Sequence, residues 1–272
     1  MTTPTKLTDA VALSRFRKRA TRDALFIQGT AADEIQDRLM MVNRAFTAPA
    51  VVTPFPDLWA DRLPQAKVVV DTETLDLDVG AHDLVIHATG LHWSNDPVGQ
   101  LIQCKRSLKP DGLMIAATLG GQTLHELRSV LAQAEINLTG GLSPRVLPMG
   151  EIRDLGALLQ RAGFALPVAD SVPLTVSYRD CLHLMRDLRQ MGESNAMTSR
   201  KKVAPPRALF RDAAMQYEAT FADAEKRVTA TFELVFLTGW APDPSQQQPL
   251  RPGSAKQRLA DALSVPETPL PD

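Results

Sequence analysis

The sequence predicts an α/β fold built around an open, largely parallel β-sheet, and three observations support this prediction. First, HDLVIHAT (82–89) and LMIAATLGG (113–121) each contain a short apolar run, typical of buried parallel strands. Second, SNDPVGQLIQCKRSLKPDG (94–112) has a helical pattern ending in a Pro-Asp-Gly turn signal, so the three segments form one right-handed βαβ unit. Third, VTATFELVFLTGW (228–240) alternates apolar and polar residues, as an antiparallel last strand does.

The chain before this unit is predicted to begin with two helices within residues 8–46. The first has an apolar stripe at helical spacing, and the second, at 31–46, has another. The first helix is also rich in arginine, as organelle transit peptides are, but its stripe favours a structural helix that packs on the body of the protein. The stripe residues are Leu13, Phe16, Ala20, Ala24 and Ile27 in the first helix, and Ile35, Leu39, Met40 and Val42 in the second.

Two short strands follow, at AVVT (50–53) and KVVVD (67–71). The residues between them leave room for one short helix, PDLWADRL (56–63), because a parallel crossover needs about a dozen residues or more. The rest of the chain is predicted to contain helices at 123–136, 151–164, 180–191 and 206–222, with a strand at 166–178.

These elements divide the chain into three parts. Residues 1–46 form an N-terminal helical flank, and 47–241 form the α/β domain, with a helical lid at about 180–222 inserted before the last strand. Residues 242–272 form a C-terminal tail rich in proline and polar residues.

Composition excludes several classes of protein. The 272 residues are 44% hydrophobic, enough for a full core, and 30 basic against 31 acidic residues give no net charge suited to nucleic acid. No apolar run approaches the roughly 20 residues that span a bilayer. Cys104 and Cys181 are too few for a disulfide framework, so we expect buried thiols in a reducing compartment. A soluble protein of a bacterial cytoplasm fits these features.

The motifs LHWSND (91–96), LKPDG (108–112) and LGGQTLHELR (119–128) resemble class I S-adenosylmethionine-dependent methyltransferases of the type 11, biotin-synthesis-like group. Later motifs are similar to the branch of complex I assembly factor 5, and the resemblance covers about Val68 to Ala255. These motifs are SPRV, RDLGALLQRAGFALPV, MRDLRQMGESNA, ATFELVFLTGWAP and QPLRPGSA.

This resemblance implies a Rossmann-like sheet, S-adenosylmethionine as cofactor and a protein client, such as a subunit of a respiratory complex. It also implies two chemistries, methyl transfer or, as in the mitochondrial relative, hydroxylation of an arginine. A standard core of this family has one more βα unit in the first half of its sheet than this sequence can hold.

The resemblance also indicates site residues. Asp71 and Thr72 follow the second strand, where the family binds the adenine end of the cofactor, and Ala88 ends the third strand. His92 and Trp93 follow that strand at the carboxyl end of the sheet, where His92 is the candidate general base. The alternatives are a polar strand end for Asp71 and a structural, turn-capping role for His92.

The expected cofactor turn departs from the family. No glycine occurs between Gly29 and Gly80, although a nucleotide-like cofactor needs close approach of the backbone. Pro54, Phe55 and Pro56 occupy the turn instead. Asp57 or Trp59 could contact a sulfonium ligand, or the aromatic rings could fill the vacated space. The sequence therefore predicts weak binding of S-adenosylmethionine or none, and a non-catalytic assembly factor remains an alternative to an enzyme.

Two further expectations concern metals and partners. The five histidines lack metal-ligand spacing, so no dedicated metal site is predicted. The missing βα unit should expose the sheet edge near 67–71 together with Phe55 and Trp59, which predicts a homodimer or a complex with a client.

Overall fold

The computed structural model describes residues 6–247 together with 253, 261, 263 and 264. Within these residues, one sheet has six strands in the order β2-β1-β3-β4-β6-β5. Strands β1 to β4 pair in parallel, and β6 pairs antiparallel with both β4 and β5. The predicted α/β fold with an antiparallel last strand is confirmed. The strands are β1 Pro49–Val52, β2 Lys67–Val69, β3 His82–Ala88, β4 Leu108–Leu119, β5 Ala165–Tyr178 and β6 Val228–Trp240.

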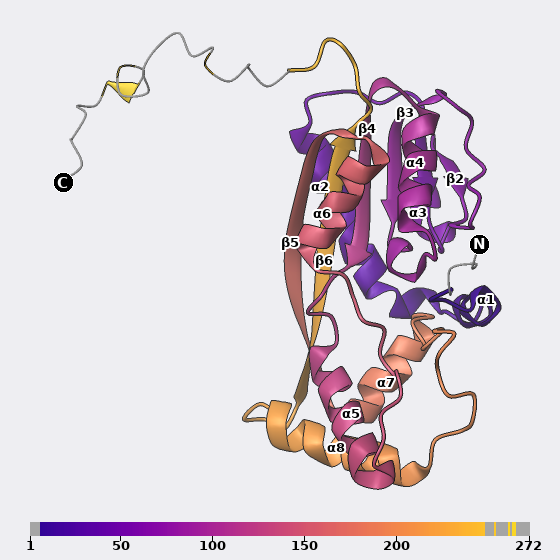
Figure 1. Cartoon of the computed structure of the whole chain (residues 1–272), viewed down its shortest axis with the longest axis vertical. Helices are drawn as coiled ribbons and strands as arrows, with labels where there is room; N and C mark the ends of the chain where they lie inside the picture. The colour runs from indigo at the N-terminus through magenta and orange to yellow at the C-terminus, as the bar shows by residue number, and fades with distance from the viewer. Residues whose placement is uncertain (1–5, 248–252, 254–260, 262, 265–272) are drawn as a thin grey trace. The chain divides into compact units, whose positions relative to one another are not determined.

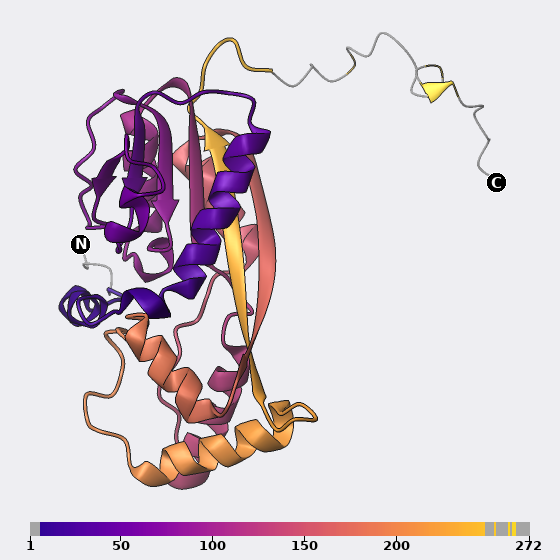
Figure 2. The same cartoon turned by 180° about the vertical axis from the view of Figure 1, so that it is seen from behind.

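Helices cover both faces of the sheet. Figure 1 shows α4 and α6 on one face, and Figure 2 shows α2 across the opposite face. Helices α5, α7 and α8 form a separate group beyond the carboxyl ends of the parallel strands, and the long strands β5 and β6 extend to reach it (Figure 1). The helices are α1 Ala10–Arg17, α2 Phe26–Met41, α3 Asp57–Ala60, α4 Pro97–Ser107, α5 His125–Thr139, α6 Ile152–Ala162, α7 Cys181–Gln190 and α8 Arg207–Phe221, with short 3₁₀ turns η1 Arg22–Ala24 and η2 Leu91–Trp93.

The sheet lies in a compact unit, Met1–Pro242, and Asp243–Asp272 forms a second unit. Most of the expected tail, including the QPLRPGSA segment, lies outside the described residues.

Local sequence explains where the helices begin and end. The Asp96 carboxylate caps α4 by accepting a hydrogen bond from Gly99 N at 2.8 Å, and Pro97 follows at the first helical position. The Asp180 carboxylate caps α7 in the same way, at 2.7 Å from His183 N. Helix α6 ends at Gly163, whose φ of 79° is the left-handed conformation that glycine favours.

The first half of the sheet has the predicted shortened form. A single four-residue helix, α3, connects β1 to β2, and no helix or strand occurs between β2 and β3. Strand β2 therefore forms one edge of the sheet. The prediction that Phe55 and Trp59 are exposed beside this edge is wrong, because Phe55 is only 9% exposed and Trp59 only 1%. Both rings are buried, as the alternative interpretation held.

Three predicted boundaries differ from the structure. The first helix ends at Arg17 because the chain turns there, and α2 begins at Phe26, so the expected stripe is divided between two helices and a 3₁₀ turn. Helix α2 ends at Met41, and Met40, predicted to be apolar and inward, is 75% exposed. Helix α4 ends at Ser107, because Leu108 already pairs with His82 as part of β4.

The N-terminal helix nevertheless packs on the body, as predicted. Leu13 is buried in a small cluster with Trp93 and Met197. Backbone hydrogen bonds join Asp9 N to Ala196 O at 2.8 Å and Thr21 N to Gln190 O at 2.9 Å. Helix α1 is therefore held by the segment that follows α7.

Helix α5 contains a buried carboxylate that stabilises the lid region. Glu135 is 1% exposed and accepts hydrogen bonds from Ser143 and Arg145 and from Lys201 Nζ at 2.7 Å. Burial acts to raise the pKa of Glu135, but these donors outweigh it and lower the pKa from 4.5 to about 2.

We therefore expect Glu135 to stabilise the fold by about 3 kcal/mol at neutral pH. Because its pKa is lower in the folded chain than in the unfolded chain, this stability is complete above pH 4.5 and is lost as the pH falls towards 2. Urea unfolding of wild type and Glu135→Gln should show a large difference at pH 7 that shrinks towards pH 2. A difference that stays constant with pH would contradict this role.

Candidate functional site

Two cavities lie at the carboxyl end of the parallel strands, and Trp93 borders both. The first, the cofactor-side pocket, has a volume of about 440 Å³ and lies between α1 and the segments that follow β1, β2 and β3. Its position is where ligands bind in open α/β sheets. Its polar lining comprises Thr8, Ser14, Arg17, Lys18, Asp71, Thr72, Glu73, Ser94, Asn95 and Gln100.

An ion pair between α1 and the end of β2 lies in this pocket. Arg17 Nη1 donates to both Oδ1 and Oδ2 of Asp71 at 2.9 Å. The two side chains are only 11% and 4% exposed. Gly90 makes room for the carboxylate, since a Cβ there would lie 2.2 Å from Asp71 Oδ2. The acidic residue expected to hold the adenine end of the cofactor is therefore bound to an arginine of the same chain.

A second buried carboxylate joins the LHW motif to the segment that follows α7. Glu193 Oε2 accepts a hydrogen bond from Trp93 Nε1 at 2.7 Å and lies 3.2 Å from His92 Nε2. Burial acts to raise the pKa of Glu193, but His92, Arg17 and Trp93 together lower it, so the carboxylate form is favoured. The motif MRDLRQMGESNA includes Glu193, but sequence pattern alone gave it no role.

Another buried polar contact lies below the pocket. His87 Nε2 is 2.8 Å from Gln100 Oε1, and Gln100 Nε2 donates to Thr72 O at 3.0 Å. Burial lowers the pKa of His87, which favours its neutral form. This contact fixes the backbone at Thr72 against α4.

The second cavity, here called the lid-side cavity, has a volume of about 260 Å³ and lies among α2, α5, α7 and α8. Its walls are mainly apolar, and Gln28, Trp93 and Glu193 are among its polar residues. The apolar residues are Ile27, Leu119, Leu124, Leu127, Leu131, Val146, Leu147, Met149, Met185, Leu188, Met191, Phe210 and Phe232.

The polar groups around these cavities are not all satisfied. In the part of the chain that the structure describes, the following buried atoms have no hydrogen-bond partner: Arg17 Nε and Nη2, Gln28 Oε1, His87 Nδ1, His92 Nδ1 and Glu193 Oε1. Unpaired donors border the cofactor-side pocket, and unpaired acceptors border the lid-side cavity. The two cavities therefore favour ligands of opposite polarity.

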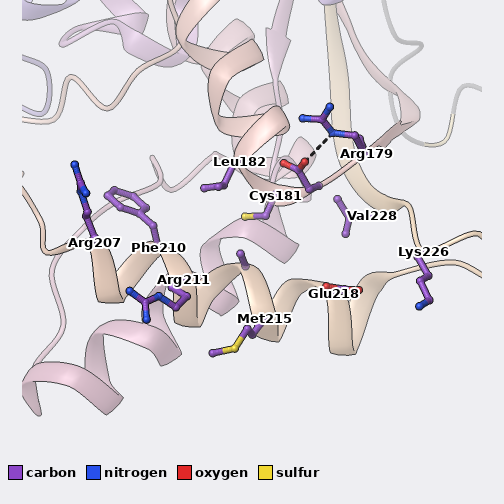
Figure 3. A pocket seen from close by; sticks show the side chains of 12 residues that line it. Arg179, Cys181, Leu182, Arg207, Phe210, Arg211, Met215, Glu218, Lys226 and Val228 are labelled. Carbon is purple, nitrogen blue, oxygen red and sulfur yellow. Dashed lines mark hydrogen bonds and ion pairs between the residues drawn. The ribbon is translucent and has the colours of Figure 1, made fainter.

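A third hollow lies on the outside of the lid, between α7 and α8 and the start of β6, with a volume of about 550 Å³. Figure 3 shows Arg207 and Arg211 beside Phe210 on α8, with Met215 further along the helix and Lys226 at the far end of the hollow. Arg179 Nε lies 2.9 Å from Asp180 Oδ2. None of the residues that line this hollow was predicted from the sequence to be a site residue.

The structure brings together only some of the predicted site residues. Asp71, Thr72 and Trp93 line the cofactor-side pocket, whereas Asp57, Ala88 and His92 are not among its lining residues. Asp57 begins α3 and is exposed, and Ala88 is buried at the end of β3. His92 is buried against Glu193 instead. Arg17, Gln100 and Glu193 were missed because their partners are distant in sequence.

The described residues offer neither a metal site nor a membrane span. No group of three or more histidine, cysteine, aspartate or glutamate side chains there is arranged to hold a metal ion. None of the described helices is both long and apolar enough to cross a membrane. Cys104 and Cys181 are buried free thiols, as predicted.

The sheet order and the site at its carboxyl end agree with a family match over part of the chain. A family model described as a methyltransferase domain matches residues 40–116. The chain is 39% identical to the mitochondrial arginine-hydroxylase NDUFAF5 of Danio rerio over 83% of this chain and 70% of that protein. It is 38% identical to the Homo sapiens protein of the same name, over 79% of this chain but only 62% of that protein.

The chain belongs to the NDUFAF5 family. Among solved structures it is similar to the YcgJ protein of Bacillus subtilis, with a TM-score of 0.45 and 11% identity, over 75% of this chain and 97% of that chain.

Proposed function

We propose that this chain is a methyltransferase-like protein with an eroded cofactor loop that serves the assembly of respiratory complex I by engaging a protein client. Membership of the NDUFAF5 family supports the link to assembly. The observation that carries the proposal is the Arg17–Asp71 ion pair, which uses the carboxylate expected to hold the cofactor. The lid-side cavity is not involved in that contact and is available for a client.

The residues of the cofactor-side pocket do not fit S-adenosylmethionine well. Both oxygens of Asp71 already accept from Arg17, so binding adenosine there would compete with a buried ion pair. The charged lining is balanced, with Arg17 and Lys18 against Asp71 and Glu73, so it gives a sulfonium cation no net attraction. Pro54 lines the pocket where the family exposes glycine backbone.

We expect isothermal titration of the full chain with S-adenosylhomocysteine to show no binding in the micromolar range. Micromolar or tighter binding would contradict the eroded-loop proposal. In that case Asp71→Ala tests whether the ligand binds at Asp71, since loss of a charged hydrogen bond should weaken binding by about 1.5–3 kcal/mol.

In the native host, deletion of the chain should reduce assembled complex I on a native gel, and normal assembly would contradict the proposed role.

The second candidate is modification of a client arginine. The relatives in Danio rerio and Homo sapiens are named arginine-hydroxylases, and the lid-side cavity contains a buried carboxylate suited to a guanidinium. Mass spectrometry of complex I subunits purified with and without the chain tests this candidate. An arginine that gains 16 Da only when the chain is present would favour it over a purely structural role.

A further inference from the structure

Helix α8 has two stripes of apolar side chains, and only one of them packs on the core. Leu209, Ala213 and Tyr217 form the buried stripe, and none of them is more than 1% exposed. A second stripe, here called the outer stripe, lines the third hollow at the same helical spacing. Its residues are Arg207, Phe210, Arg211, Ala214, Met215 and Glu218. Packing of the fold does not explain why the outer stripe contains apolar residues.

Exposed apolar side chains from two helices meet in this hollow. Met215 on α8 is 58% exposed, and Leu182 on α7 is 49% exposed. Both line the hollow together with the partly buried Phe210 (Figure 3). Single exposed apolar residues are ordinary, but several that share one concave hollow are typical of a binding surface. Because the hollow lies between two helices, it suits a rod-shaped partner better than a flat bilayer.

The charged side chains of the hollow are mainly positive. Arg179 and Asp180 pair with each other, whereas Arg207, Arg211 and Lys226 have no ion pair among the described residues. Arg207 and Arg211 lie one helical turn apart, a spacing at which like charges destabilise a helix. Arg207 is also the first residue of α8, where the helix dipole disfavours a cation. An external anion explains these two arginines better than the stability of the helix does.

Nearby carboxylates leave this positive charge available. Asn137 Nδ2 of α5 donates to Asp212 Oδ2 at 3.2 Å, and Asp212 is not part of the lining. Glu218 lies about 16 Å from Arg207 along the helix axis, at 1.5 Å per residue. That distance is about twice the Debye length of ~8 Å at physiological salt, so Glu218 does not neutralise the arginine. The first turns of α8 therefore attract negative charge.

We propose that the hollow between α7 and α8 binds an acidic amphipathic helix of a protein partner. The apolar face of that helix packs on Phe210, Met215 and Leu182, and two of its carboxylates, one turn apart, meet Arg207 and Arg211. The outer stripe is about 16 Å long, so about three turns of the partner helix cover it. This inference goes beyond the proposed function, because it does not depend on the cofactor or on complex I.

The test uses a fluorescein-labelled helical peptide, Ac-AEAALEALLEALAA-NH₂, and two matched peptides in which every glutamate is replaced by glutamine or by lysine. We expect fluorescence anisotropy with the full chain to show micromolar binding of the glutamate peptide. The glutamine peptide should bind roughly 3- to 10-fold more weakly, and the lysine peptide should show no saturable binding. Equal binding of the three peptides, or no binding of the glutamate peptide, would overturn the inference.

A charge reversal tests the two arginines. The double variant Arg207→Glu with Arg211→Glu changes exposed residues and should fold, since it removes a cation from the start of α8. It should bind the glutamate peptide at least tenfold more weakly and should gain binding of the lysine peptide. The matched control, Arg106→Glu with Arg161→Glu, makes the same change in net charge at exposed residues of α4 and α6 and should bind as wild type does.

A further variant tests the apolar contact. Met215→Ser should weaken binding of the glutamate and glutamine peptides alike, by several-fold, because it removes apolar contact area without changing the charge. Unchanged affinity in both Met215→Ser and the charge-reversal variant would exclude this hollow as the binding surface.

Vesicles made of equal parts of phosphatidylcholine and phosphatidylglycerol test a membrane as the occupant. We expect the wild-type chain not to sediment with them. Sedimentation that the charge reversal abolishes, without selective binding of the glutamate peptide, would overturn the inference in favour of a membrane surface. The titration with S-adenosylhomocysteine and the assembly assay do not use this hollow, so they succeed or fail independently of the peptide result.

Discussion

Removal of residues 1–28 should give a chain that is insoluble or has no cooperative unfolding transition. The segment contributes the buried side chains Leu13, Leu25 and Ile27. Burial of three such side chains is worth roughly 5–9 kcal/mol, at about 1.5–3 kcal/mol each, and a whole domain is stable by only about 5–15 kcal/mol. The deletion also removes Arg17 and leaves the buried Asp71 carboxylate without its ion pair. Differential scanning calorimetry and the soluble yield measure the result.

Two point variants on α1 test whether the stability depends on a buried side chain of this helix. Leu13 is 7% exposed and Val11 is 82% exposed, and both lie on α1. Leu13→Ala should cost about 2–5 kcal/mol, whereas Val11→Ala should stay within about 0.5 kcal/mol of wild type. A truncated chain as stable as the full chain would show that the segment is not part of the fold.

Much of the sheet could be predicted from the sequence because its signals are local. Strands β3 and β4 each contain a short apolar run, and all seven residues of β3 are buried, as expected for a parallel strand covered on both faces. The predicted inward positions of α5, such as Leu127 and Val130, are buried because helical periodicity reports one face directly. The shortened connection between β1 and β2 follows from counting residues.

The helix boundaries near the N-terminus were harder to predict. The apolar stripe from Leu13 to Ile27 continues across a chain reversal, and residues on both sides of the reversal face the same body. Periodicity therefore indicated one helix where the chain forms two. Tertiary hydrogen bonds, such as Thr21 N to Gln190 O, stabilise the break.

The polar contacts of the site could not be predicted from local pattern. Arg17 and Asp71 are 54 residues apart, and Trp93 and Glu193 are 100 residues apart. Sequence resemblance identified Asp71 and Trp93, but it gave no information on which side chains would bind them. Only the docking of α1 and of the segment after α7 at the carboxyl end of the sheet brings these partners together.

The last prediction concerns the ion pair between Arg17 and Asp71. Arg17→Leu should destabilise the protein by about 3–5 kcal/mol, because it leaves a carboxylate that is 4% exposed without its positive partner. Urea unfolding at pH 7 measures the change. In the double variant Arg17→Leu with Asp71→Asn, part of the stability should return, since the uncompensated charge is removed. A double-mutant cycle then gives the coupling between the two residues.

Arg19→Leu is the matched control, because Arg19 lies two residues further along the chain and is exposed. It should change stability by less than about 0.5 kcal/mol. If Arg17→Leu changes the stability as little as Arg19→Leu does, the ion pair does not stabilise the fold. The ion pair then no longer supports the proposal that Asp71 is unavailable to a cofactor. The opposite outcome is that only Arg17→Leu lowers the stability and that Asp71→Asn restores part of it. In that case the Asp71 carboxylate, which related proteins are expected to offer to a cofactor, holds α1 over the carboxyl end of the sheet.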